Sequence, residues 1–156
     1  MSYPHYSGEC SEHHGLVRDF GGERPQIVCL CGSTRFMDAF HEAGWLETLA
    51  GKIVLSVGVA KHVQTPDGGH AAEALGPGVA DALDALHKRK IDLADEVLVV
   101  SDEAGYFGES TWGEIRYAWQ QGKPVEFVQP AAKARAHEFT EDDRAALVAA
   151  LEPEEA

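Results

Sequence analysis

Four short runs rich in valine and isoleucine recur along the chain, and each is separated from the next by a segment with helical spacing. The runs are residues 27–31 (IVCLC), 53–57 (IVLSV), 96–100 (EVLVV) and 125–128 (VEFV). Nearly continuous apolar runs of this length are typical of strands buried on both faces of a parallel sheet. Alternation of such strands with helices, joined by glycine-rich turns, predicts an α/β fold whose parallel sheet has helices on both faces.

The segments between the strands predict amphipathic helices, because their apolar residues recur every three or four positions. We expect helices over residues 34–50 and 79–94, one that follows Ser110 and ends at Gly122, and a last one over about 140–151. The apolar positions on these helices are Phe36, Phe40, Ala43, Leu46, Leu83, Ile91, Ala94, Ile115, Ala118, Trp119, Leu147, Val148 and Leu151.

The chain length suits one domain, which we place at residues 25–151. Residues 1–24 are rich in glycine with little apolar periodicity, so they are interpreted as a flexible N-terminal lead-in, and residues 152–156 as a frayed tail. The long loop at 60–78 is typical of a lid or a binding segment. Its two histidines, His62 and His70, are interpreted as solvated loop residues.

Charge and cysteine content limit the classes of partner. Twenty-six acidic residues against 13 Lys and Arg give a formal charge of −13, which opposes binding to a nucleic acid polymer but leaves a small anion possible.

We expect no membrane segment, because no long apolar run is present. We expect a cytoplasmic location, because a reducing compartment suits the three cysteines. Two of them, Cys29 and Cys31, are interpreted as small hydrophobes in a strand.

A cluster near the N-terminus offers three potential metal ligands, Cys10, His13 and His14. Zinc normally takes four ligands, and this spacing supplies no obvious fourth. We therefore expect no metal and no organic cofactor in the functional site.

The segment from Ser101 to Ala118 (SDEAGYFGESTWGEIRYA) follows the third strand and places Glu114 near the start of a helix. In parallel sheets, small ligands bind beyond the carboxyl ends of the strands, so Glu114 is a candidate catalytic carboxylate. The alternative is structural. If Ser110 or Thr111 caps the helix, an acid three or four residues later serves as a capping-box partner.

The turn after the first strand, Gly32, Ser33, Thr34 and Arg35, combines backbone N–H groups, two hydroxyls and a guanidinium. Such groups can bind a phosphate. By itself the string is a weak signal, and taken alone it favours a helix N-cap followed by a surface arginine.

His87 shares the apolar face of the 79–94 helix and lies close in sequence to the strand that precedes Glu114. It is a candidate proton donor, or else a buried histidine that is hydrogen-bonded and inert. Asp84, Lys88 and Asp92 lie on another face at a spacing of four and are interpreted as a solvated row of charges.

Three segments in this order resemble the nucleoside 2-deoxyribosyltransferase superfamily: CGSTRF at 31–36, LADEVLVV at 93–100 and GESTWGEIRYAWQQGKPV at 108–125. The first resembles the phosphate loop of the 2'-deoxynucleoside 5'-phosphate N-hydrolases. The resemblance spans roughly residues 26–128. It implies a Rossmann-like, flavodoxin-like three-layer sandwich with four or five parallel strands, and a homo-oligomer.

The resemblance also implies roles for individual residues. Glu114 takes the position of the nucleophile that attacks the sugar. The phosphate contacts fall to Gly32, Ser33, Thr34 and Arg35, while Ser110 and Thr111 complete the pocket. His87 stands where the family commonly has an aspartate that assists the leaving base, and Arg116 stands where a glycine is frequent.

These roles predict an enzyme that cleaves or exchanges the N-glycosidic bond of a nucleoside 5'-monophosphate, with Glu114 as nucleophile and His87 as proton donor. The substitution of histidine for the acid favours an alternative, a non-catalytic module that binds or senses nucleotides. A third hypothesis is that the protein is a structural subunit of an assembly. It does not explain why a glycine-rich loop follows both strands.

Overall fold

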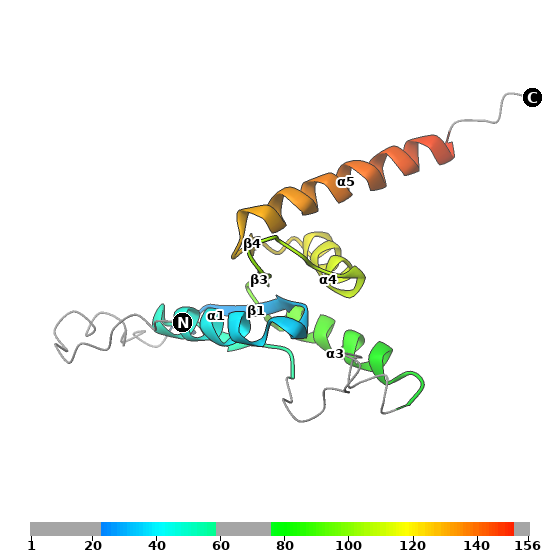
Figure 1. Cartoon of the computed structure of the whole chain (residues 1–156). Coiled ribbons are helices and arrows are strands. Elements are labelled where there is room, and N and C mark those ends of the chain that lie inside the picture. The colour runs from blue at the N-terminus through cyan, green and yellow to red at the C-terminus, as the bar shows by residue number, and fades with distance from the viewer. Residues whose placement is uncertain (1–22, 59–75, 152–156) are drawn as a thin grey trace, which may run out of the picture.

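A four-stranded parallel sheet forms the centre of the molecule (Figure 1). The computed structural model describes residues 23–58 and 76–151. The strands are β1 (Ile27–Gly32), β2 (Ile53–Leu55), β3 (Glu96–Val100) and β4 (Val125–Phe127), and their order across the sheet is β2-β1-β3-β4. The predicted α/β sandwich is confirmed, and this strand order is that of flavodoxin-like folds.

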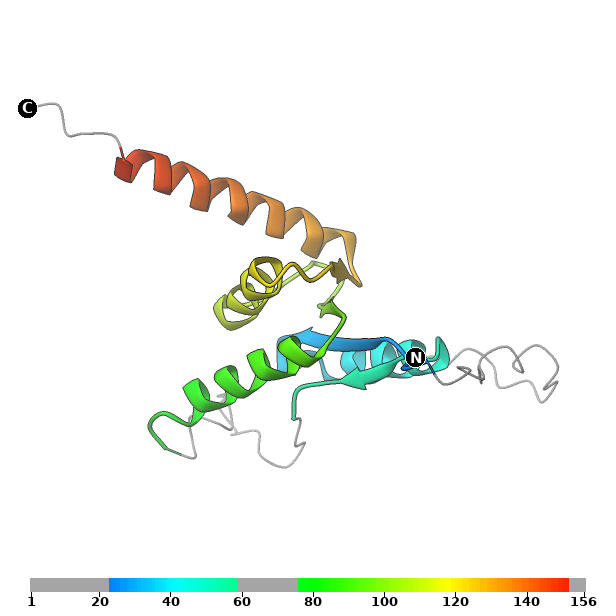
Figure 2. The same cartoon turned by 180° about the vertical axis from the view of Figure 1, so that it is seen from behind.

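The helices divide unequally between the two faces of the sheet, as Figures 1 and 2 show from opposite sides. They are α1 (Met37–Leu49), which follows the short 3-10 turn η2 (Thr34–Phe36), α3 (Val79–Leu93), α4 (Glu109–Gln120) and α5 (Pro130–Leu151). The chain crosses from β1 to β2 in one direction and from β2 to β3 in the other. Because such crossovers are right-handed, α1 lies on one face, whereas α3, α4 and α5 lie on the other.

Alternation along the strands separates the core into two layers. Cys29, Cys31, Val97 and Val99 face α3 and α4 and are buried with Ile115. The intervening residues of the same strands face α1 instead. A strand presents successive side chains to opposite faces, so the i and i+2 positions of β1 meet the same helices.

An aromatic cluster joins the loop after β3 to α4 and α5. The ring of Phe107, 1% exposed, stacks on Trp112 with centroids 6.2 Å apart and meets the edge of Phe139 at 5.6 Å. The loop passes so close to α5 that a Cβ on Gly105 would lie 2.4 Å from the backbone of Ala131. Its φ of +76° also favours glycine.

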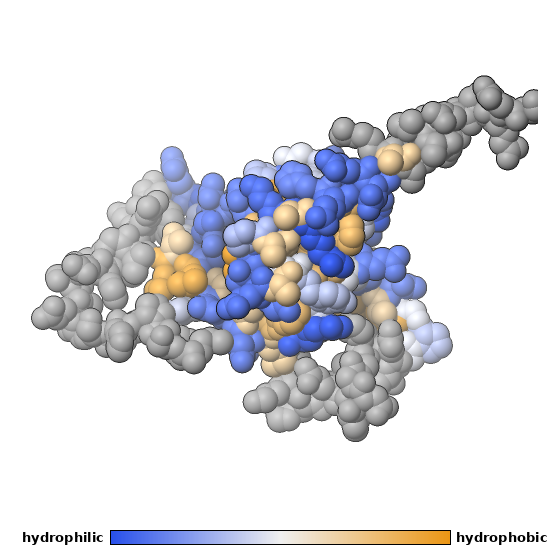
Figure 3. Space-filling view, turned by 45° about the horizontal axis from the view of Figure 1, so that its top comes forward, coloured by the Kyte–Doolittle hydropathy of each residue, from blue (hydrophilic) through white to orange (hydrophobic). Residues whose placement is uncertain are grey.

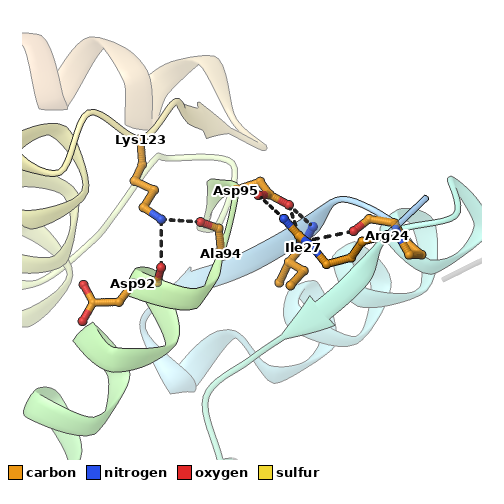
Figure 4. A network of polar contacts seen from close by, with 7 residues as sticks. Arg24, Ile27, Asp92, Ala94, Asp95 and Lys123 are labelled. Carbon is orange, nitrogen blue, oxygen red and sulfur yellow. Dashed lines mark hydrogen bonds and ion pairs between the residues drawn. The ribbon is translucent and has the colours of Figure 1, made fainter. Parts of the chain in front are cut away.

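Polar contacts hold the opposite end of the sheet, where β1 and β3 begin (Figure 4). The Asp95 carboxylate accepts two hydrogen bonds of 2.9 Å from Arg24 and one of 2.8 Å from the backbone N–H of Ile27. Lys123 donates to the carbonyls of Asp92 and Ala94 at the C-terminus of α3. These bonds fix the position of the short segment that joins the end of α3 to the start of β3.

Replacing Asp95 by Asn should destabilise the protein in a pH-dependent way. Hydrogen bonding to Arg24, and then to Ile27, lowers the pKa of Asp95 from 3.8 to about 2. A carboxyl whose pKa is lower in the folded state contributes stability above its unfolded pKa, and that contribution is lost as the pH falls through the folded value. Urea unfolding of wild type and Asp95→Asn should therefore differ most above pH 4 and converge near pH 2.

A matched control is Glu103→Gln, because Glu103 is an exposed acid in the turn after β3. It should change the free energy of unfolding by no more than about 0.5 kcal/mol. A difference between Asp95→Asn and wild type that stays constant from pH 7 to pH 2 would show that the Asp95 charge adds nothing.

The structure corrects three details of the predicted elements. The last helix begins at Pro130, ten residues before the expected start at 140, because proline fits the first turn of a helix and the alanines that follow favour helix. The expected inward positions Leu46 and Leu83 are 47% and 50% exposed. Strand β2 ends at Leu55, two residues earlier than predicted.

The face of the molecule in Figure 3 is mostly hydrophilic, with small apolar areas between the charged side chains. Every helix in the part of the chain that the structure describes is too short or too polar to cross a lipid bilayer.

Candidate active site

The loops that follow β1 and β3 meet beyond the carboxyl ends of these neighbouring strands. The guanidinium carbon of Arg35 lies 4.7 Å from the centroid of the Tyr106 ring, and Phe36 meets the same ring edge-on at 6.2 Å. Strand β2 lies next to β1 on one side, and β3, the following strand in the chain, lies next to β1 on the other side. Such a switch in strand order is where open α/β sheets bind ligands.

Gly32 ends β1 at this position and allows it to approach β3 closely. A Cβ on Gly32 would lie 2.3 Å from the carbonyl oxygen of Val100, so any larger residue would push the two strands apart. Ser33 and Thr34 follow at half-buried positions and Arg35 is exposed. Ser33 occupies the N-cap position of η2 but makes no side-chain cap hydrogen bond, so the structure agrees with the N-cap alternative in the positions of Ser33 and Arg35 but not in the cap itself.

Glu114 lies in the second turn of α4 with its carboxylate in the interior. The residue is 5% exposed, and its Oε2 atom is buried without a hydrogen-bond partner. Helix α4 begins at Glu109 with Gly108 as the N-cap residue and no side-chain cap. The capping-box alternative is therefore wrong, since Glu114 is too far along the helix to reach its N-terminus.

His87 projects from α3 into the same interior space. Its Nε2 atom lies 3.9 Å from Oε1 of Glu114, 3.3 Å from Sγ of Cys31 and 3.7 Å from Sγ of Cys29. The four side chains come from β1, α3 and α4, and each is buried. The structure thus brings the two predicted catalytic residues together beneath the end of β1.

Burial and mutual contacts shift the pKa values of these groups. Burial raises the pKa of Glu114 to about 7, against the opposing effect of His87. Burial alone would lower the pKa of His87, but its hydrogen bond to Cys29 and the charge of Glu114 raise it above its usual value. Hydrogen bonding between the thiols lowers the pKa of Cys29 to about 5 and, together with burial, raises that of Cys31.

Ser110 and Thr111 lie at the start of α4 in different surroundings. The exposed Ser110 donates a hydrogen bond of 2.9 Å to Oδ1 of Asp84 on α3, and Thr111 is buried. Asp84 is half-buried and this bond is exposed, so Asp84 keeps contact with solvent, as its spacing suggested, and also has a partner on α4. Its charge contributes to the raised pKa of Glu114.

Sequence reasoning assigned no role in the site to Cys29 and Cys31. Their Cys-x-Cys spacing in a strand was the available signal, because residues i and i+2 point to the same face. What the spacing could not show was that His87 would pack on that face. The Cys10, His13 and His14 cluster, together with His62 and His70, lies outside the residues that the structure describes.

The arrangement offers a carboxylate and an imidazole 3.9 Å apart, which suffices for nucleophilic attack with proton transfer. It also brings together three potential metal ligands, Cys29, Cys31 and His87. The chain matches no family model, no curated protein and no solved structure.

Proposed function

We propose that the protein cleaves or exchanges the N-glycosidic bond of a nucleoside 5'-monophosphate. The observation that supports this most directly is the meeting of His87 and Glu114 beneath the end of β1. Two residues that lie 27 positions apart in the chain are thereby held together at the edge of the sheet where ligands bind. The resemblance of the three sequence segments supports the choice of substrate class.

In this mechanism the Glu114 carboxylate attacks the anomeric carbon of the sugar. The bond between that carbon and the base nitrogen breaks, and the bonding electrons leave with the base. Protonated His87 gives the departing base its proton. The resulting glycosyl ester on Glu114 is then attacked by water, which releases the sugar phosphate, or by a second base, which completes an exchange.

The 5'-phosphate would bind at the turn after β1. Arg35 supplies a guanidinium that can donate two parallel hydrogen bonds to phosphate oxygens, and Ser33 and Thr34 supply hydroxyls. The stacking of Arg35 on Tyr106 limits the directions in which its guanidinium can point. On the side of the pocket that α4 forms, Ser110 and Thr111 would contact the sugar.

A non-catalytic nucleotide-binding module is the second candidate. It is favoured by the burial of Glu114, which is 5% exposed, because a sugar carbon reaches this carboxylate only if the side chains over it move. The module would use the turn at Ser33 to Arg35 for the phosphate without any bond cleavage.

The test is incubation of the protein with a panel of ribose and deoxyribose nucleoside 5'-monophosphates, in the presence of a chelator, with chromatography of the free bases. The enzyme should release base from at least one of them. A nucleotide that raises the melting temperature yet is recovered intact after long incubation would establish the binding module instead.

Replacing Arg35 by Ala should weaken phosphate binding, because the guanidinium supplies a charged donor. We expect KM for the monophosphate to rise about tenfold or more, with little change for the corresponding nucleoside. Arg89→Ala is the matched control, since Arg89 is an exposed arginine on α3 that bonds to Asp92. Equal effects of the two substitutions would remove Arg35 from the phosphate site.

The proposal extends to a homo-oligomer in the cytoplasm. Leu83 and Leu86 on α3 are 50% and 54% exposed, as residues of a subunit interface would be in an isolated chain. The free thiols of Cys29 and Cys31 suit a reducing compartment. Light scattering on the purified protein measures the oligomeric state.

A further inference from the structure

Two thiols, an imidazole and a carboxylate converge in the core between β1, α3 and α4. The thiols belong to Cys29 and Cys31, which point to the same face of β1, and the imidazole belongs to His87 on α3. Sulfur and imidazole nitrogen are the ligands that zinc prefers in proteins. The mechanism proposed above has no use for the two cysteines.

The distances between the ligand atoms suit a tetrahedral ion. In zinc sites the metal lies about 2.3 Å from sulfur and about 2.0 Å from nitrogen, so a sulfur and a nitrogen ligand are about 3.5 Å apart. Here the Nε2 atom of His87 lies 3.3 Å from Sγ of Cys31 and 3.7 Å from Sγ of Cys29. All three atoms lie within 4.8 Å of one another.

Glu114 is an independent sign that a cation belongs here. Its Oε1 atom is 3.9 Å from Nε2 of His87, against about 3.4 Å for a nitrogen and an oxygen ligand on one tetrahedral zinc ion, so a small rotation of the Glu114 side chain would bring it to the metal. Its Oε2 atom is buried and has no hydrogen-bond partner, although the residue is only 5% exposed. A buried carboxylate oxygen without a partner is costly, and coordination to a cation would satisfy it.

We propose that Cys29, Cys31 and His87 bind a thiophilic divalent cation, Zn²⁺ being the best fit, with Glu114 as the fourth ligand. Two sulfurs, one nitrogen and one oxygen complete a four-coordinate site. Because a strand and two helices of the core hold the ligands, the ion would tie β1 to α3 and α4. With four protein ligands, the site has no open position for a substrate.

Metal binding and the proposed glycosidase chemistry exclude each other. The ion would take the lone pair of His87 and the carboxylate of Glu114, which are the groups that the mechanism needs. The metal-bound protein should therefore release no base, and removal of the ion by a chelator should restore the activity. Metal binding itself does not depend on the proposed function.

The experiment is equilibrium dialysis of chelator-treated protein against Zn²⁺, with the bound metal measured by mass spectrometry. We expect one ion per chain in wild type and uptake at least about tenfold weaker in Cys31→Ser and His87→Gln. His137→Gln is the control for histidine, since His137 is exposed on α5. Cys10→Ser is the control for cysteine, and it also tests the cluster with His13 and His14.

Cobalt provides a second measurement that does not depend on whether the Cys31 and His87 variants fold. Co²⁺ bound by thiolates gives a charge-transfer absorbance in the near ultraviolet, which should appear in wild type and in Cys10→Ser alike. The site is ruled out if wild type binds much less than one ion, if Co²⁺ binds without the thiolate band, or if Cys10→Ser abolishes the band.

The metal site and the glycosidase function can each be disproved without affecting the other. Uptake of one ion by a protein that releases no base in either state would remove the glycosidase and keep the metal site. Base release that Zn²⁺ leaves unchanged, in a protein that takes up no ion, would do the opposite.

Discussion

Replacing Glu114 by Gln is expected to lower the rate of base release by about a thousandfold or more without unfolding the protein. The amide has nearly the shape of the carboxyl group, so it can occupy the same interior site, but it carries no negative charge with which to attack the sugar. Loss of an enzyme nucleophile typically has an effect of this size or larger. Initial rates of base release, measured with chelator present, give the comparison.

The matched control is Glu109→Gln at the exposed first position of α4. It should retain the activity of wild type, because it removes one acidic charge from the same helix without reaching the interior. Melting temperatures and far-ultraviolet circular dichroism of both variants exclude unfolding as the cause. If Glu114→Gln keeps more than a tenth of the wild-type rate, Glu114 is not the nucleophile and the proposed mechanism is wrong.

Replacing Phe107 by Ala is expected to cost about 3 to 5 kcal/mol of the free energy of unfolding. Phe107 is 1% exposed, and its ring contacts Trp112 on α4 and Phe139 on α5. Truncation would leave a cavity where the loop after β3, α4 and α5 join. Domains of this size are stable by about 5 to 15 kcal/mol, so the substitution would remove a large fraction of the free energy of unfolding. Urea unfolding measures the change.

Leu93→Ala at the end of α3 is the control, because Leu93 is 68% exposed. It should change the free energy of unfolding by less than about 1 kcal/mol. A loss below about 1 kcal/mol for Phe107→Ala would mean that α5 is not held to the rest of the molecule through this ring.

The predicted and observed helices differ in where the last helix begins and in which apolar residues are buried. The last helix was expected only from about residue 140, yet Pro130 starts α5, because the first turn of a helix needs no N–H from that residue. Leu83 has the spacing of a core residue, but the first turns of α3 extend beyond the sheet and leave it exposed. Spacing identifies an apolar face without showing what lies opposite.

The proposed site, too, could be predicted from the sequence only in part. Glu114 and His87 were candidates from sequence, each with a structural alternative. The capping alternative for Glu114 depended on where α4 begins, and that point, at Glu109 after Gly108, is decided by the loop from β3. The hydrogen bond between Asp84 and Ser110 could not be predicted, because the two residues lie 26 positions apart in the chain.

The sequence by itself determined that this chain alternates strands and helices around a parallel sheet, because apolar periodicity and glycine-rich turns act over a few residues. Only the tertiary structure decided that Cys29, Cys31, His87 and Glu114 share one buried space. They come from three elements, and their distances depend on strand order, on crossover direction and on how α3 and α4 pack. These are long-range properties, and no local pattern of residues encodes them.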